Sequence, residues 1–246
     1  MSAPRQVALC GDELPRAAAA VKRAGLAVVR RDPDVVLCHG GDGTLLRAER
    51  EWPGVPKVPV RVAGRARPCP DHDLDSVLAR LVRGELERES LPLLHCAVGG
   101  LRLAALNDVV LRNESPATAV RLRVRIDGQE SGEITGDGLV CATPFGSSGY
   151  YRSITRETFE RGLGLAWNNS IEPRAPQVVP PGQPVEVELL RGPAVLVHDN
   201  DPRTVFLREG QRFRVELGQQ VAVVLGLDAL GCQRCRRADG TVFNPH

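Results

Sequence analysis

The chain opens with short apolar runs separated by a helical pattern. Apolar runs at 6–10, 26–29 and 35–38 predict strands, and the alanine-rich stretch 14–23, followed by Gly25, predicts a helix that ends there. Strand, helix and strand in alternation favour a parallel sheet with helices on its faces.

The next stretch continues this pattern more weakly. Residues 52–70 are rich in proline and predict a loop that contains one short strand, 58–62. Apolar residues then recur at a spacing of three and four over 73–83, which predicts a helix that ends at Gly84.

From Leu91 onward the pattern changes to period two. Apolar and polar residues alternate over 120–126, 185–189 and 213–217, which predicts antiparallel strands with one buried face. Asp127-Gly128 is typical of a tight hairpin turn. The arginines that alternate along 120–126 are interpreted as a solvated strand face.

These patterns predict two domains within the 246 residues. The first, at 1–88, is an α/β domain with a parallel sheet, and the second, at 89–228, is a β-rich, antiparallel, sandwich-like domain. Residues 229–246 are predicted to be a polar C-terminal tail.

Composition narrows the class of protein. A hydrophobic share of 42% with 25% charged residues is ordinary for a globular enzyme, and a net charge of +2 does not favour nucleic acid as a partner. No apolar run reaches the length of about 18–20 residues that spans a bilayer, so no membrane association is expected. The polar start at 1–5 lacks the pattern of a signal peptide, which favours a cytoplasmic location.

Cysteine usage agrees with that location. The chain has seven cysteines, of which Cys10, Cys38, Cys96 and Cys141 lie in apolar runs and are expected to be reduced and buried. Cys232-Gln233-Arg234-Cys235 is a single C-x-x-C pair, and a zinc site would require a second pair. No metal ligands are therefore assigned to the protein.

The most informative motif follows the strand predicted at 35–38. Gly40, Gly41 and Gly43 surround the carboxylate of Asp42, and Thr44 is the expected N-cap of the helix that follows. A glycine turn at a helix N-terminus is a site for anions. This motif therefore suits delivery of a phosphoryl group to a hydroxyl held by Asp42, although an ordinary turn with a surface aspartate has the same pattern.

Three patches in the second half also carry chemistry. Asn107-Asp108 interrupts an apolar strand and can bracket ribose hydroxyls, or can simply form a turn or β-bulge. Asp137 is a second glycine-flanked acid. The loop at 143–153 is dense in hydroxyls and glycines that can bind phosphate or ribose, and Tyr150 can stack on a base. The polar residues at 198–201 are explained as turn chemistry.

Together these motifs resemble those of the NAD kinases, in the same order and at similar spacing over residues 35 to 227. The matching stretches are His39-Gly40-Gly41-Asp42-Gly43-Thr44, Leu106-Asn107-Asp108, Gly136-Asp137-Gly138 and Thr143-Pro144-Phe145-Gly146-Ser147-Ser148-Gly149-Tyr150. The first motif is shared with diacylglycerol, sphingoid and 6-phosphofructo-kinases. The later motifs are more specific.

The resemblance implies transfer of a phosphoryl group from ATP or polyphosphate, with Mg²⁺ or another divalent cation, to the 2′-hydroxyl of the adenosine ribose of NAD. Asp42 matches the catalytic base. The residues that match NAD-binding positions are Gly43, Asn107, Asp108, Asp137, Ser148, Gly149, Tyr150 and Ser153. The expected phosphate loops comprise Gly40, Gly41, Thr44, Thr143, Gly146 and Ser147. The family fold is an α/β domain followed by a β-rich domain, usually in homodimers or homotetramers.

The chain also departs from the family pattern. Residues 59–67 replace a Gly-Ile-Asn-x-Gly-x-Leu-Gly-Phe-Leu type segment on the nicotinamide side, and Asp199-Asn200-Asp201 replaces an Asp-Gly-Gln type turn. Phe145 stands where a small hydroxyl residue is common. NADH therefore remains open as acceptor, and a lipid or sphingoid kinase and a non-catalytic NAD(P)-binding module are the alternative functions.

Overall fold

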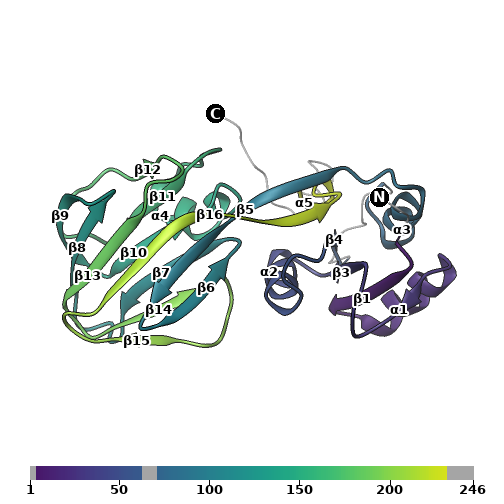
Figure 1. Cartoon of the computed structure of the whole chain (residues 1–246), viewed down its shortest axis with the longest axis horizontal. Helices are drawn as coiled ribbons and strands as arrows, with labels where there is room; N and C mark the ends of the chain where they lie inside the picture. The colour runs from purple at the N-terminus through teal and green to yellow at the C-terminus, as the bar shows by residue number, and fades with distance from the viewer. Residues whose placement is uncertain (1–3, 63–70, 232–246) are drawn as a thin grey trace. The chain divides into compact units, whose positions relative to one another are not determined.

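The computed structural model describes residues 4–62 and 71–231 of the chain (Figure 1). It divides into a first unit, made of Met1–Leu91 and Ala222–His246, and a second unit, Pro92–Val221. The first unit is therefore built from two separate stretches of chain, and the second is continuous.

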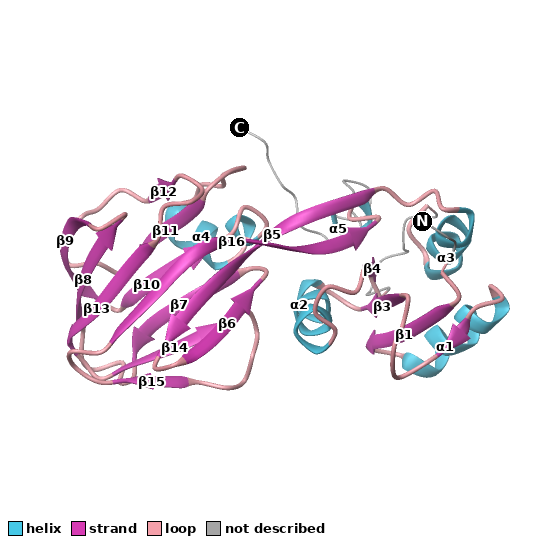
Figure 2. Ribbon diagram, in the orientation of Figure 1, coloured by secondary structure: helices cyan, strands magenta, loops and turns pink. Residues whose placement is uncertain are grey.

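The first unit has a parallel sheet with strand order β2-β1-β3-β4, extended by the end of β16, where Val224 lies opposite Lys57 (Figure 2). Its elements are β1 (Gln6–Gly11), α1 (Leu14–Arg23), β2 (Ala27–Val28), β3 (Val35–His39), α2 (Asp42–Glu51), β4 (Lys57–Val60), α3 (Leu74–Arg83) and α5 (Asp228–Gly231). Apolar side chains of β3, β4, α1 and α3 form its core. This is the α/β architecture that the alternating pattern predicted.

The second unit packs two antiparallel layers over one apolar core. One layer has strand order β16-β13-β8-β9, with β5 and β6 attached through β16, and the other has order β12-β11-β10-β7-β14-β15. The strands are β5 (Arg88–Val98), β6 (Leu101–Ala105), β7 (Asp108–Asn113), β8 (Val120–Ile126), β9 (Gln129–Gly136), β10 (Gly138–Ala142), β11 (Leu163–Asn168), β12 (Gln177–Val179), β13 (Val185–Arg191), β14 (Ala194–His198), β15 (Val205–Leu207) and β16 (Arg212–Leu225). A 3₁₀ turn, Gly146–Ser148, and α4, Tyr150–Thr155, follow β10.

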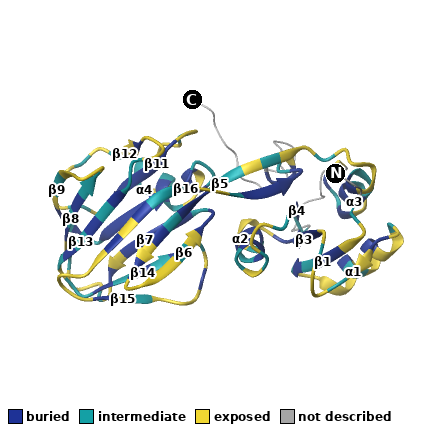
Figure 3. Ribbon diagram, in the orientation of Figure 1, coloured by how far each residue is buried: buried dark blue, intermediate teal, exposed yellow. Residues whose placement is uncertain are grey.

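Period-two burial holds this sandwich together. In β8, Val120, Leu122 and Val124 are buried in the core, whereas Arg121 on the other face is exposed. Figure 3 shows the same contrast of buried and exposed residues along the strands. The sandwich-like antiparallel fold predicted from the alternation is thus confirmed.

Local details of the prediction are also confirmed. Asp127 and Gly128 join β8 to β9 with φ of 50° and 76°, the positive values that a type I′ hairpin turn requires. The helix expected over 73–83 is α3, which ends at Gly84 as predicted; Asp73, for which no role was predicted, caps it by accepting a hydrogen bond from the N–H of Ser76 at 2.8 Å. Cys10, Cys38, Cys96 and Cys141 are free and buried, and burial raises the pKa of the Cys96 thiol to about 12.

Two details were wrong. The strand expected at 58–62 is β4, which begins one residue earlier and ends at Val60. Thr44 is not an N-cap, because α2 begins at Asp42 and its N-cap is Gly41 in an extended conformation. Cys232 and Cys235 lie outside the described residues. No helix of the described chain is long and apolar enough to cross a membrane.

Candidate active site

The glycine-rich loop of the first unit is held by backbone hydrogen bonds at the end of the fully buried strand β3. The N–H of Gly40 donates to the carbonyl of Val60 at 2.8 Å, and the N–H of Asp12 donates to the carbonyl of His39 at 2.7 Å. The His39 ring Nδ1 contacts the Asp12 carbonyl at 2.8 Å. These bonds join the ends of three neighbouring parallel strands, where ligands bind in open α/β sheets.

Glycine is required at Gly40, because a Cβ there would collide with the hydroxyl of Thr44. The Thr44 side chain, in the first turn of α2, therefore lies directly over the Gly40 backbone. A Cβ on Gly41, in contrast, would meet nothing within 4 Å. The Asp42 side chain, on the first residue of α2, is 65% exposed. Backbone at a helix N-terminus next to open space can receive an anion, with the carboxylate beside it.

In the second unit, the Asn107-Asp108 pair is held by a residue that the sequence analysis had assigned to a turn. One Asp199 carboxylate oxygen accepts hydrogen bonds from the N–H of Asn107 at 2.7 Å and of Asp108 at 3.2 Å, and the other accepts from Leu106 at 3.0 Å. The N–H of Asp199 donates in return to the Asp108 carbonyl at 2.9 Å. Asp199 does lie in a turn, as expected, but turn chemistry alone does not account for it, since its side chain also fixes the backbone of the polar pair.

The hydroxyl-rich loop packs directly on Asn107. The Thr143 hydroxyl donates to the carbonyl of Leu106 at 2.6 Å and accepts from the N–H of Gly146 at 2.9 Å. The N–H of Thr143 donates to the carbonyl of Asn107 at 2.9 Å. A Cβ on Gly149 would lie 3.2 Å from the Asn107 amide nitrogen. Residues far apart in the sequence thus form one polar cluster at the start of β7, which we call the Asn107 cluster: Leu106–Asp108, Thr143–Gly149 and Asp199.

The other predicted binding residues, within this loop and in α4 after it, differ in their contacts and exposure. The Tyr150 hydroxyl accepts a hydrogen bond from the Asn168 amide at 3.1 Å, so its ring is oriented by β11. The Ser147 hydroxyl donates to the Pro144 carbonyl at 2.7 Å and supports the loop from inside. Ser148 and Ser153 are exposed, and their hydroxyls donate to the carbonyls of Phe145 at 3.3 Å and Tyr150 at 2.7 Å. Exposed hydroxyls of this kind can turn toward a ligand.

Asp137 lies apart from the Asn107 cluster. Along the β7–β10 pair, Asp108 is opposite Ala142, whereas the N–H of Asn113 at the other end of β7 donates to the Asp137 carbonyl at 2.8 Å. Five residues of strand separate the two ends, about 17 Å at the usual rise per residue. One adenosine bound at Asn107 in this unit cannot also contact Asp137, whose carboxylate accepts from the Asn169 amide at 3.1 Å.

Burial gives Asp108 unusual protonation chemistry. Desolvation, together with the nearby Asp199 carboxylate, raises the pKa of Asp108 to about 7, and the hydrogen bond from the Asn107 amide opposes this shift. The pKa of Asp199 is also raised, chiefly by burial. Asp108 therefore gains a proton near neutral pH, which turns one acceptor oxygen of the pair into a donor hydroxyl and weakens its capacity to accept hydrogen bonds.

A pH dependence follows from this shift. We expect KM for the acceptor to increase below about pH 7, because protonated Asp108 loses acceptor capacity. We expect Asp108→Asn to bind weakly at every pH and to lose this dependence. Since the folded state binds a proton that the unfolded chain has released, the contribution of Asp108 to stability decreases between about pH 4 and 7 as pH rises. Initial rates and denaturant unfolding from pH 5 to 9 measure both effects, and an unchanged profile in the variant would exclude Asp108 as the titrating group.

Asp199 gives a second prediction. An asparagine there keeps one acceptor oxygen and points an amide donor at backbone N–H groups, so Asp199→Asn should lose about 1–3 kcal/mol of unfolding free energy and raise KM for the acceptor about tenfold. Asp201→Asn is the matched control, because Asp201 lies in the same turn but pairs with Arg203 at 2.6 Å. It should lower stability without changing KM. Equal KM in the two variants would refute positioning by Asp199.

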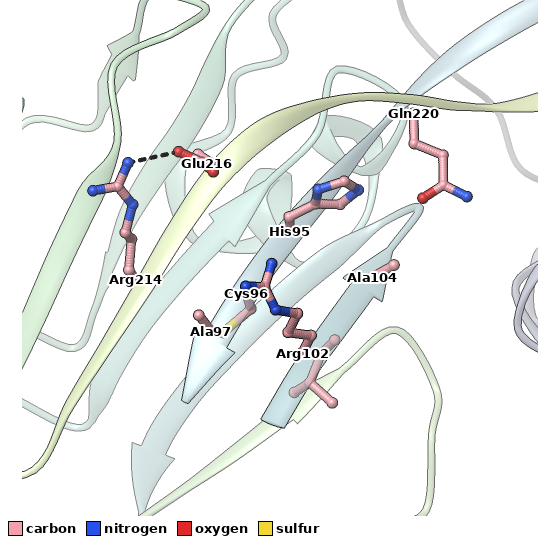
Figure 4. A pocket seen from close by; sticks show the side chains of 9 residues that line it. His95, Cys96, Ala97, Arg102, Ala104, Arg214, Glu216 and Gln220 are labelled. Carbon is pink, nitrogen blue, oxygen red and sulfur yellow. Dashed lines mark hydrogen bonds and ion pairs between the residues drawn. The ribbon is translucent and has the colours of Figure 1, made fainter. Parts of the chain in front are cut away.

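Two hollows of the second unit are lined by other residues than those predicted to bind the nucleotide. One of about 470 Å³ is bounded by β5, β6 and β16, and Figure 4 shows it with His95 and Arg102 near the Arg214–Glu216 pair. Another, of about 890 Å³, includes His95 and Pro144. None of the predicted binding residues lines either hollow. Their linings combine apolar surface with charged side chains, Arg102 and Arg214 in the first and Glu160 and Arg161 in the second.

A metal bound by side chains alone does not fit the described residues. Between 4 and 62 and between 71 and 231, no three His, Cys, Asp or Glu side chains gather in a group that could hold an ion. Mg²⁺ prefers a few carboxylates plus phosphate oxygens and water. A cation that arrived with a phosphate ligand would need few protein ligands, and the exposed carboxylate of Asp42 beside the glycine turn could supply one.

The chain is similar to known kinases of dinucleotides. Residues 106–226 match the ATP-NAD kinase C-terminal domain family. An NAD kinase from Gemmatimonas aurantiaca is 33% identical over 179 residues, which cover 67% of this chain and 62% of that protein. An NAD kinase from Saccharolobus islandicus is 29% identical over 219 residues, 85% of this chain and 87% of that protein.

Two solved structures share the fold. A crystal structure of an NAD kinase from Archaeoglobus fulgidus in complex with ATP superposes with a TM-score of 0.75 at 22% identity, over 96% of this chain and 97% of that one. Yeast NADH kinase complexed with NADH gives a TM-score of 0.80 at 16% identity, over 98% and 90%. The two-unit α/β plus β-sandwich architecture is common to all three.

Proposed function

We propose that this chain, which belongs to the NAD kinase family, transfers the γ-phosphoryl group of ATP to the 2′-hydroxyl of the adenosine ribose of NAD. The observation that carries the proposal is the Asn107 cluster, in which an amide and a buried carboxylate are held by Asp199 and covered by the 143–149 loop. Paired acceptor and donor groups at fixed positions suit vicinal ribose hydroxyls.

In this mechanism the Asn107 cluster binds and orients the acceptor, and Asp42 acts as the general base. Asp42 accepts the proton of the 2′-hydroxyl as the new oxygen–phosphorus bond forms and the bond to the leaving ADP breaks. Phosphoryl transfer depends mainly on positioning and charge stabilisation, to which the backbone at the start of α2 contributes. A divalent cation, when bound with ATP, would neutralise charge on the phosphates. Convergence of Asp42 with the Asn107 cluster on one substrate stays a prediction.

The remaining assignments extend this proposal. Asp137 lies at the opposite end of β10 from Ala142, so its binding role requires a second copy of the chain that brings its own Asp137 to the nucleotide. This requirement supports the expected homodimer or homotetramer. The sequence relatives, which are NAD kinases, argue against the lipid-kinase alternative. Polyphosphate as donor, NADH as acceptor and a cytoplasmic location stay predictions.

The experiment that tests the function is an assay of NADP formation by the purified protein. ATP and polyphosphate are offered as donors and NAD and NADH as acceptors, each with Mg²⁺ and with a chelator. We expect ATP-dependent phosphorylation that requires the cation. Binding of NAD in calorimetry without any phosphorylated product would instead establish a non-catalytic binding module, and phosphorylation of a sphingoid base alone would establish a lipid kinase.

A further inference from the structure

Arg61 lies next to the proposed catalytic carboxylate. It follows β4, and the neighbouring strand pair places Val60 opposite His39, with the Gly40 N–H bonded to the Val60 carbonyl at 2.8 Å. The guanidinium nitrogen Nη2 is 3.7 Å from Asp42 Oδ1 and donates to the carbonyl of Leu230 at 3.0 Å. The side chain is 34% exposed. Arg61 thus combines a fixed anchor with access to the anion-binding turn.

The chain has only two lysines, and neither is placed to bind a phosphate beside Asp42. Another cationic side chain is therefore needed at this turn. Lys57 is fully buried and paired with Glu49, and burial lowers its pKa. Lys22 lies in the last turn of α1, which returns the chain to the start of β2. In a parallel sheet, that end is opposite to the one where β3 delivers Asp42. Neither lysine can therefore take the phosphate-binding role that a P-loop lysine has.

We propose that Arg61 binds the transferring phosphoryl group of the donor and stabilises its charge in the transition state, an inference that rests on the proposed function. A hydroxyl oxygen that donates to Asp42 lies about 2.6–3.2 Å from the carboxylate. The guanidinium is 3.7 Å from the same carboxylate. A phosphoryl group that reacts with this hydroxyl is therefore within reach of Arg61, whose planar fork suits phosphate oxygens.

The last helix of the described chain positions this arginine. Leu230 belongs to α5, which is tied to the body of the first unit through Asp228. The Asp228 carboxylate contacts His72 Nε2 at 3.1 Å and Arg80 Nη1 at 3.4 Å. These contacts hold the Leu230 carbonyl where it receives Arg61. Arg61 also falls in the stretch 59–67, where the chain departs from the family pattern.

The test separates the charge of Arg61 from the shape of its side chain. Arg61→Gln is two bonds shorter and carries no charge, so it loses both the charge and the bond that Nη2 makes to Leu230, whereas Arg61→Lys keeps the charge without the planar fork. We expect kcat of Arg61→Gln to decrease by about 10²–10³, comparable to removal of one transition-state donor, with KM for NAD unchanged. Arg61→Lys should retain more of kcat, and added guanidinium ions should partly restore Arg61→Gln.

Melting temperatures of all variants, and Arg83→Ala as control, complete the experiment. Arg83 is exposed and pairs with Glu85, so its loss should leave kcat unchanged. If Arg61→Gln keeps kcat within about threefold of wild type, or melts earlier with no response to guanidinium, the proposal is overturned while the kinase function stands. If the wild-type protein itself forms no phosphorylated dinucleotide, both proposals fall.

Discussion

Asp42→Asn is expected to lower kcat by at least about 10³ while the protein remains folded. Asparagine preserves the shape of the side chain but cannot take the proton of the acceptor hydroxyl, and general-base catalysis contributes about 10²–10⁴ in rate. The side chain is 65% exposed, so its replacement leaves no unpaired buried group. Single-turnover measurement of NADP formation, with KM for NAD and ATP determined in parallel, checks this result.

Asp75→Asn is the matched control, because Asp75 also lies in the first turn of a ten-residue helix, α3. Both substitutions remove a negative charge from a helix N-terminus, which costs about 0.3–1 kcal/mol of stability. We expect the two variants to melt similarly and only Asp42→Asn to lose turnover. Near wild-type kcat in Asp42→Asn would remove Asp42 from the mechanism.

Gly146→Ala is expected to disrupt the Asn107 cluster from inside. The added Cβ would collide with the carbonyl oxygen of Asn107 and lie 2.6 Å from its carbonyl carbon, so one backbone segment has to move. Forced overpacking costs about 1–3 kcal/mol. Because the displaced segment carries Asn107, affinity for the acceptor should fall at least about tenfold as well. Chemical denaturation and NAD titration measure the two effects.

Gly182→Ala separates this collision from general glycine effects. A Cβ on Gly182 meets nothing within 4 Å, although its φ of 86° strains an alanine there. We expect this control to lose about 1 kcal/mol of stability and to bind NAD normally. Equal NAD affinity in Gly146→Ala and wild type would show that the 143–149 loop does not hold Asn107 in its binding position.

Much of the fold could be predicted because it depends on local patterns. The alternation in β8 and the Asp127-Gly128 turn specify a hairpin without information from elsewhere in the chain. The helix α3 has its cap, its apolar face and its terminal glycine all within one short stretch. The structure of a segment can be predicted from its sequence when such local signals agree.

The candidate site was less predictable, because its decisive contacts are long-range. Asp199 and Asn107 are 92 residues apart, and the polar residues around Asp199 are typical of a simple turn. The one available signal was its place in the Asp-Gly-Gln type segment of the family. Thr44 was misplaced for a local reason, since serine and threonine are better N-caps than glycine, yet the structure caps α2 with Gly41 and begins the helix at Asp42.

The discontinuity of the first unit has a consequence for biosynthesis. Ala222–Leu225 of β16 and the helix α5 join this unit only after the whole sandwich has been translated. Until then, the exposed edge of β4 has no parallel neighbour on that side, and Arg61 lacks the carbonyl that anchors it. Assembly of the part of the first unit that carries Arg61 is therefore coupled to synthesis of the chain beyond Val221, and a nascent chain arrested before Ala222 should form no NADP.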